Sequence, residues 1–217
     1  GGCDGPELAL PDPPPPPRTT RLEPQDGLPV HPQPTCSRAI LKTLYTSDWT
    51  VLARLVAGGD TVRCRVPPDS SPLEQAILKD DVVGVRTVLQ AGADPNLRSG
   101  SHGDRLPLRA AIDSFVPPRP RPNQAAMVRV LLEHGADPNA RWCWSETRQG
   151  LWGPQGPVGP RACHSAVGPT PLTTATSNDR ADLIALLFEG GADVTAEDWT
   201  GSSSLDIATG RAVFELL

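Results

Sequence analysis

The stretch that decides the fold reads VLLEHGADPN and occupies residues 130–139. Its centre recurs along the chain as a short motif with Gly that ends in Asp. The four copies are Ala57-Gly58-Gly59-Asp60, Ala91-Gly92-Ala93-Asp94, His134-Gly135-Ala136-Asp137 and Gly190-Gly191-Ala192-Asp193. A second motif, usually ending in Pro-Leu, occurs at Ser71-Pro72-Leu73, Leu106-Pro107-Leu108, Thr170-Pro171-Leu172 and, without the Pro, Ser203-Ser204-Leu205. Leu73 and Leu172 each precede the Gly of the next copy by 19 residues. Two motifs at a fixed spacing predict an internal repeat.

Each repeat predicts two short helices. Pro72 suits the first turn of a helix, where its missing N–H is not needed. Val85, Val88 and Leu89 have the spacing of one apolar helix face. Gly92 then ends that second helix, because glycine adopts positive φ without strain. The expected unit is therefore a helix, a tight turn, a second helix and a projecting loop, which makes the fold class all-α.

This pattern resembles the ankyrin repeat, whose signature is TPLHxA near the first helix and LLxxGAD at the end of the second. The resemblance implies a solenoid of about four to five helix-turn-helix units. The expected units are 38–66, 67–100, 104–140, 168–200 and a partial cap at 201–217. The His of TPLH is replaced by Glu74, Arg109, Thr173 and Asp206. In the family that His ties neighbouring turns together, so the resemblance leaves the bonding between units open here.

Residues 1–37 form a Pro-rich arm that we expect to be disordered, since such composition cannot bury enough apolar surface to fold. Pro13, Pro16 and Arg18 fit a PxxPx+ ligand pattern for an SH3 domain. A simple spacer is the alternative. Because the chain begins with Gly1 rather than Met, we expect a fragment or a processed product.

Two insertions interrupt the array. Residues 116–123 are rich in Pro and are expected to loop out between the two helices of the unit 104–140, because consecutive prolines cannot continue a helix. Residues 141–168 form a longer loop with no periodicity. Translated non-coding sequence is the alternative for this second stretch.

Composition and cysteine use exclude several classes of protein. The net charge of −5 argues against a bulk nucleic-acid binder, and no apolar run approaches the length of a membrane span. The five cysteines are odd in number and widely spaced, without a CxxC pair. They predict reduced thiols in an intracellular protein rather than a disulfide scaffold or a metal site. We expect a monomer located in the cytoplasm, the nucleus or both.

The sequence carries no catalytic motif: GxSxG, HExxH, a P-loop and GxGxxG after a strand are all missing. We therefore expect no enzyme, no catalytic residue and no cofactor. The resemblance implies an interaction module, an adaptor or scaffold, that binds a protein partner through its turns and the outer faces of its first helices. Two alternatives are the substrate receptor of a cullin-type ubiquitin ligase and the regulatory region of a larger enzyme or transcription regulator.

The candidate partner-binding residues are polar, charged or aromatic and lie on the expected turns and first helices. They are Gln75, Lys79, Arg98, Arg105, Asp113, Arg141, Trp142, Asn178, Asp198 and Trp199. Trp and Arg are enriched among interface hot spots, and Trp199 is the leading single candidate. By resemblance to the family, Asn139 is also a candidate for hydroxylation by an oxygen-sensing hydroxylase. The alternative is a turn asparagine kept for its local hydrogen bonds.

Overall fold

The computed structural model describes residues 34–68, 70–99, 106–113, 122–141, 168–198 and 201–208. Within these ranges the regular structure is helical, with two isolated β-bridges and no strand. This confirms the all-α class for the described residues. The chain divides into two units, Gly1–His31 and Pro32–Leu217, and every described residue belongs to the second. The predicted SH3 ligand at Pro13, Pro16 and Arg18 lies outside the described residues.

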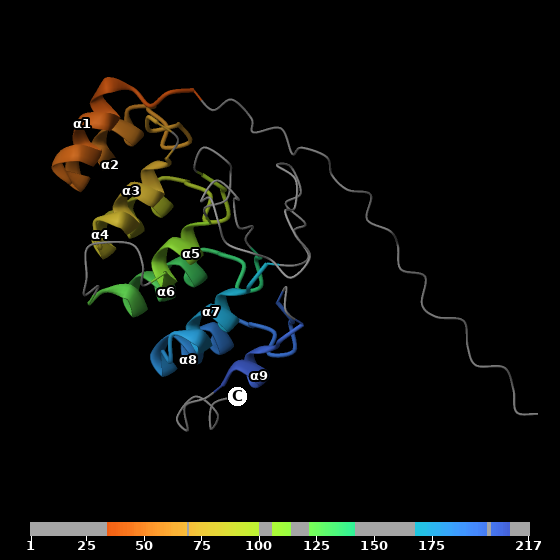
Figure 1. Cartoon of the computed structure of the whole chain (residues 1–217). Coiled ribbons are helices and arrows are strands. Elements are labelled where there is room, and N and C mark those ends of the chain that lie inside the picture. The colour runs from red at the N-terminus through yellow and green to blue at the C-terminus, as the bar shows by residue number, and fades with distance from the viewer. Residues whose placement is uncertain are drawn as a thin grey trace, which may run out of the picture. The chain divides into compact units, whose positions relative to one another are not determined.

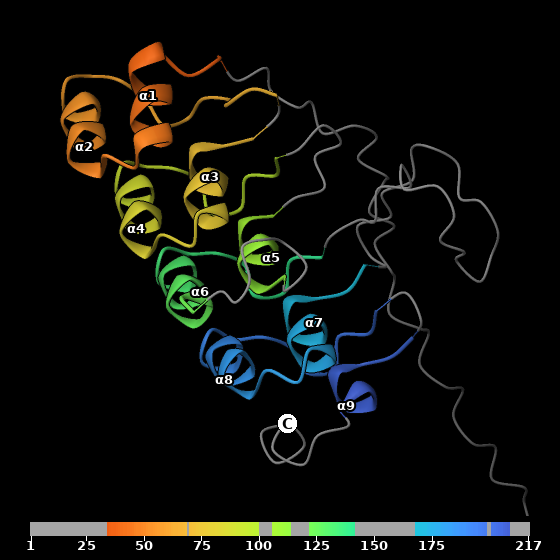
Figure 2. The same ribbon diagram turned by 60° about the vertical axis from the view of Figure 1, so that its left-hand side comes forward.

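The helices of the described ranges come in pairs that stack in chain order (Figure 1). Their bounds are α1 Arg38–Thr46, α2 Trp49–Ala57, α3 Pro72–Leu78, α4 Val82–Gln90, α5 Pro107–Ile112, α6 Gln124–Glu133, α7 Pro171–Ser177, α8 Ala181–Glu189 and α9 Ser204–Ile207. Figure 2 shows two columns of helices. The first-helix column holds α1, α3, α5, α7 and α9, and the second-helix column holds α2, α4, α6 and α8. Each helix from α1 to α8 packs on its pair partner, and helices that follow one another in a column also pack together.

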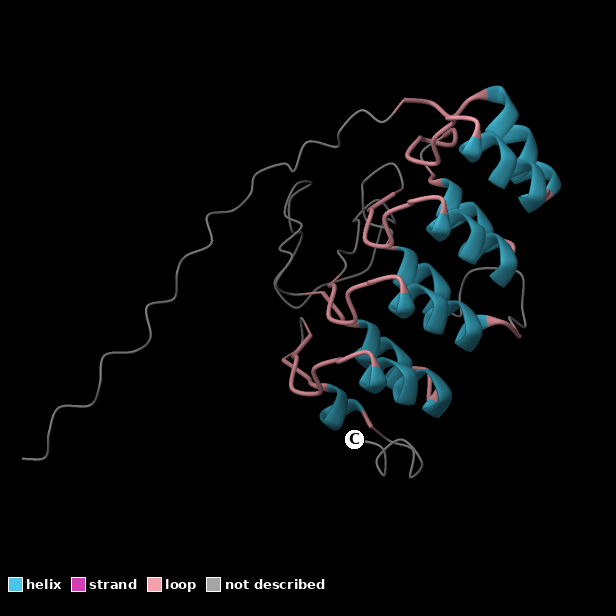
Figure 3. Cartoon of the chain, turned by 180° about the vertical axis from the view of Figure 1, so that it is seen from behind, coloured by secondary structure: helices cyan, strands magenta, loops and turns pink. Residues whose placement is uncertain are grey.

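Local chemistry explains where the helices begin and end. Ser71 and Thr170 accept a hydrogen bond from the third residue of α3 and α7, and a proline follows each of them. These contacts satisfy N–H groups that a helix start leaves without partners. After each second helix a glycine takes positive φ, at 90° for Gly92 and 86° for both Gly135 and Gly191. The connecting loops then gather on one side of the stack, as Figure 3 shows.

The apolar core lies between the two columns and runs without a break from unit to unit. Short aliphatic side chains fill it, as expected from the low aromatic content. The largest side chains that are fully buried are Ile40, Leu52, Leu73, Ile77, Ile112, Met127, Leu131, Leu172, Leu183, Ile184 and Leu187, together with Glu74. Because no unit encloses its apolar residues alone, each unit depends on its neighbours for burial.

The first two units are joined by an indole that lies against a glycine. The Trp49 ring packs on Gly84 of α4 so closely that a Cβ at position 84 would lie 2.3 Å from the ring. The Trp49 Nε1–H donates to Asp81 Oδ2 at 2.6 Å, and Asp81 also caps α4. The glycine is therefore required by this contact rather than by helix formation.

We predict that Gly84→Ala lowers the free energy of unfolding by about 1–3 kcal/mol, because the indole must move out of a packed site. Alanine favours helices over glycine by about 1 kcal/mol, so a stabilised protein would contradict this packing. Urea denaturation measures the change. Combining Gly84→Ala with Trp49→Phe serves as the control, since a smaller ring should reduce the cost of the extra methyl group.

The third and fourth units are joined by a buried amide. Gln124, at the start of α6, donates from Nε2 to the Ala111 and Ile112 carbonyls at 3.1 and 3.3 Å. These carbonyls belong to the end of α5, where the chain leaves the helix before the Pro-rich insertion. Gln124 Oε1 accepts from Arg180 of the next unit. Arg180 forms a salt bridge with Asp182 at 2.7 Å, which lowers the pKa of Asp182 through their hydrogen bond.

The N-terminal end of the stack differs from the prediction in two ways. Residues 34–37, assigned by composition to the arm, belong to the folded unit: Cys36 N–H donates to Arg65 O, and Arg65 N–H donates to Pro34 O, both at 2.9 Å. This pairing brings Cys36 and Cys64 together in a disulfide, so the expected reduced thiols are wrong for this pair. The two cysteines lie 28 residues apart in the sequence, and no sequence pattern predicted that they would meet. The cysteine argument for an intracellular protein no longer applies to these two residues.

The disulfide encloses both helices of the first unit, which has a neighbouring helix pair on one side only within the described residues. We predict that reducing it, or the double change Cys36→Ser and Cys64→Ser, lowers the free energy of unfolding by about 3–4 kcal/mol through the entropy of a loop of this length. Urea denaturation with and without reductant measures the loss. Equal midpoints in the two conditions, or alkylation of both thiols in the native unreduced protein, would show that the pair is not bonded.

The two predicted insertions lie largely outside the described residues. α5 ends at Ile112 and α6 begins at Gln124, and residues 114–121 between them are not described. The same holds for residues 142–167 between the third and fourth pairs. In the part of the chain that is described, no helix has the length and apolar character needed to span a bilayer.

Candidate binding surface at the turns

The loop that follows each second helix has the same geometry in three successive units. The carboxylate of Asp94 accepts from the backbone N–H of Asn96 at 2.8 Å, and Asp137 accepts from Asn139 at the same distance. Asp193 accepts from Thr195 at 2.9 Å. These are Asx turns, in which a short side chain fixes its own backbone. They give each unit a rigid turn in the same place.

Asn96 and Asn139 each tie one turn to the next unit. The Asn96 Nδ2 group donates to Gly135 O at 2.9 Å, while its Oδ1 accepts from the Asp137 N–H at 2.8 Å. Asn139 repeats both bonds one unit later, with Gly191 O at 3.1 Å and the Asp193 N–H at 2.8 Å. The sequence left open how neighbouring units are bonded, because the TPLH histidines are replaced. Asparagine side chains supply these bonds.

A second row of cross-unit bonds comes from arginine. Arg98 Nη2 donates to the carbonyl of Arg141 at 2.7 Å, and Arg141 Nη1 donates to the carbonyl of Glu197. Positions 98, 141 and 197 are equivalent, since each follows the motif Asp by four residues. In the first unit Val62 is buried at the position that Asn96 occupies in the second unit. The neighbouring Arg63 takes over its bond, donating from Nε to Gly92 O at 3.0 Å.

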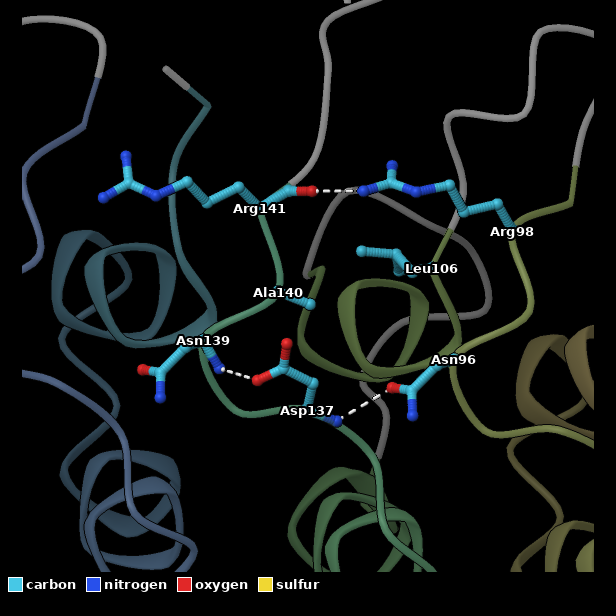
Figure 4. A pocket seen from close by; sticks show the side chains of 7 residues that line it. All are labelled: Asn96, Arg98, Leu106, Asp137, Asn139, Ala140 and Arg141. Atoms are coloured by element: carbon cyan, nitrogen blue, oxygen red, sulfur yellow. Dashed lines mark hydrogen bonds between the residues drawn. The ribbon is translucent and has the colours of Figure 1, made fainter. Parts of the chain in front are cut away.

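Hollows separate the neighbouring turns. One, of about 490 Å³, lies between the second and third turns and is lined by Asn96, Arg98, Leu106, Asp137, Asn139, Ala140 and Arg141. Figure 4 shows both guanidinium groups on one side of this hollow and the ladder of Asn96, Asp137 and Asn139 on the other. A second hollow, of about 470 Å³, lies between the first and second turns and includes Arg63, Leu97 and Asp94 in its lining.

Acidic groups lie close to the arginine row. The pKa of Asp193 is lowered, chiefly by the hydrogen bond from the Thr195 hydroxyl and to a smaller extent by the charge of Arg141. Asp137 lines the first hollow and keeps one oxygen in its own turn. The turn surface therefore carries both signs of charge, arranged in separate rows.

Nine of the ten predicted partner-binding residues, all except Lys79, fall into three groups. Arg98, Arg141 and Asp198 lie on the turns, and Gln75, Asp113 and Asn178 lie on or directly after first helices. Arg98 and Arg141 are brought together at one hollow, whereas the first-helix residues belong to three different units. Arg105, Trp142 and Trp199 lie outside the described residues, and so the predictions for them stay untested.

Lys79 has a structural role that the sequence did not reveal. Its Nζ donates to the carbonyls of Leu44 and Tyr45 and to the Ser47 hydroxyl, the last two at 2.9 and 3.1 Å. These acceptors lie at the end of α1, where carbonyls lack helical partners and a positive charge is favourable. Lys79 thus joins the first two units through the end of a helix.

Two of the four positions at which the resemblance implied a histidine, Glu74 and Thr173, form hydrogen bonds inside their own units. Thr173 forms a capping box with Thr170 at the start of α7. Glu74 is only 1% exposed, and its Oε2 accepts from the hydroxyls of Ser70 and Ser99 at 2.9 and 2.6 Å. Serine and threonine hydroxyls therefore organise the chain around the starts of α3 and α7.

Sequence reasoning missed Arg63, Gln124 and the contact of Trp49 with Gly84. The sequence contained a signal for Arg63. The first repeat lacks the Asn of the later turns, so another side chain has to donate the equivalent hydrogen bond to the next unit. Within the described ranges, no group of three or more His, Cys, Asp or Glu side chains is placed to hold a metal ion.

No protein-family model matches this chain, and a search of curated proteins finds no similar sequence.

Asn139 provides a test of the ladder, and its hydroxylation stays a prediction. Both ends of its carboxamide are engaged with the next unit, so Asn139→Ala removes two hydrogen bonds. We expect a loss of about 1–3 kcal/mol in the free energy of unfolding, measured by urea denaturation. Thr195→Ala is the matched control, because Thr195 occupies the same position but bonds only within its own turn. Equal losses for the two variants would show that the cross-unit bonds contribute nothing.

Proposed function

We propose that the chain is a non-enzymatic ankyrin-repeat module that binds a protein partner across its turns and its first-helix column. The observation that carries this proposal is the ladder of Asn96 and Asn139, which holds successive turns in one register. A surface made of equivalent positions in successive units is extended and rigid, and such surfaces suit the recognition of another protein.

The first-helix column supplies the second half of the proposed surface. Gln75 of α3 is half-buried, and Ser177 of α7 is exposed. The column lies on the same side as the projecting loops, as Figures 2 and 3 show. The second-helix column carries exposed salt bridges between units, Arg86 with Glu133 at 3.6 Å and Arg129 with Glu189 at 3.7 Å, so its charged side chains are already paired with each other there. We therefore place the proposed binding surface on the side of the stack that carries the first helices and the projecting loops.

The test compares charge added to the two columns. The full chain is used as bait in cell extract, beside a first-column variant carrying Gln75→Arg and Ser177→Arg. The control variant carries Gln90→Arg and Ala126→Arg, which add the same charge to exposed positions of α4 and α6. We expect the first-column variant to lose at least tenfold of the captured partner, measured by quantitative mass spectrometry, while the control keeps it. Equal capture by all three proteins, or equal loss by both variants, would contradict the proposed surface.

A further inference from the structure

The arginine row of the turns points to the chemistry of a ligand. Arg98 is half-buried, and its bond to the carbonyl of Arg141 uses one of the five N–H donors of a guanidinium. Arg63 is exposed and likewise donates one bond to a carbonyl. The acceptors of these two bonds are neutral main-chain groups, so the bonds fix the positions of Arg98 and Arg63 without cancelling their charge.

The cations also have a regular spacing. Arg98 and Arg141 hold equivalent positions in neighbouring units, and each reaches to the following unit in the same way. Packed helices lie about 8–10 Å apart, so equivalent backbone positions of neighbouring units are separated by about that distance. A peptide in the polyproline II conformation advances about 3.1 Å per residue with three residues per turn, and every third side chain therefore recurs on the same face after about 9 Å.

We propose that the hollows between the first three turns bind an extended acidic segment of a partner protein in the polyproline II conformation, with carboxylates three residues apart facing Arg98 and Arg141 and a further carboxylate facing Arg63. This inference deepens the proposed function and rests on it. Guanidinium groups bind carboxylates through paired hydrogen bonds, and a fixed guanidinium loses less rotational freedom on binding. The hollows, of about 470 and 490 Å³, give each side chain room to enter between neighbouring turns.

The acidic residues of the same surface set the selectivity. Asp137 lines the hollow of Arg98 and Arg141, and Asp193 lies close enough to Arg141 to feel its charge. Both carboxylates accept hydrogen bonds within their own turns, from Asn139 and Thr195. They therefore stay in the row that contains Asn96, Asp137 and Asn139. A ligand must present its carboxylates to the guanidinium groups on the other side of the hollow. This requirement favours a peptide with spaced charges over a dense polyanion.

The experiment uses the full chain and fluorescent peptides with Glu at every third residue and Gly or Ser between. Fluorescence anisotropy should show binding of the Glu peptide, at least tenfold weaker binding when Gln or Lys replaces Glu, and weakening as salt increases. The variant carrying Arg98→Gln and Arg141→Gln should bind the Glu peptide at least tenfold more weakly. The matched control, Arg86→Gln with Arg129→Gln, removes the same charge from equivalent positions of the second-helix column and should bind within twofold of the unchanged chain.

Several results would overturn the inference. These are equal binding of the Glu and Gln peptides, an equal effect of the two arginine variants, and tighter binding of a single-stranded oligonucleotide than of the Glu peptide. Urea denaturation of both variants shows that a loss of binding is not a loss of folding. If no peptide binds while capture from extract still depends on the first-helix column, the acidic ligand is wrong and the proposed function stands.

Discussion

Contact between like helices of neighbouring units is the interaction on which the rest of this structure depends. α3 and α4 cannot enclose Leu73, Ile77 and Val88 by themselves, and the helices before and after them complete the burial. The apolar core therefore extends along the chain direction rather than around a centre. The turns have the same regular order, because each turn follows a second helix whose position is fixed by the second helix of the preceding unit.

A stack held together by neighbours is weakest where a neighbour is missing. Among the described residues, the helices of the first unit pack on α3 and α4, and contacts of three kinds strengthen this unit. The Cys36–Cys64 disulfide closes the unit on itself, Lys79 holds the end of α1, and Trp49 lies across Gly84. All three are absent from the repeat motif, since they compensate for an end that inner units do not have.

The difference between features repeated in every unit and contacts found in one unit also explains how much of the fold the sequence predicts. The helix starts at Pro72, Pro107 and Pro171 and the glycines after the second helices follow from local chemistry, and the sequence predicts them correctly. The pairing of Cys36 with Cys64 and the bonds of Gln124 depend on segments that meet only after folding. No local pattern encodes such contacts. The boundary of the arm was misplaced for the same reason, because Pro34–Ser37 owe their order to the distant segment at Arg65.

The candidate surface shows a similar mixture of local and distant causes. Arg98 and Arg141 were predicted because the resemblance implied that residues of the projecting turns face a partner. Their shared hollow and their carbonyl partners required the fold. The ladder that aligns the turns uses main-chain carbonyls and N–H groups as its targets, and those targets are present whatever side chains the units carry. Side chains elsewhere on the turns can therefore change without breaking the alignment, which separates the residues that hold the surface in shape from those proposed to recognise a partner.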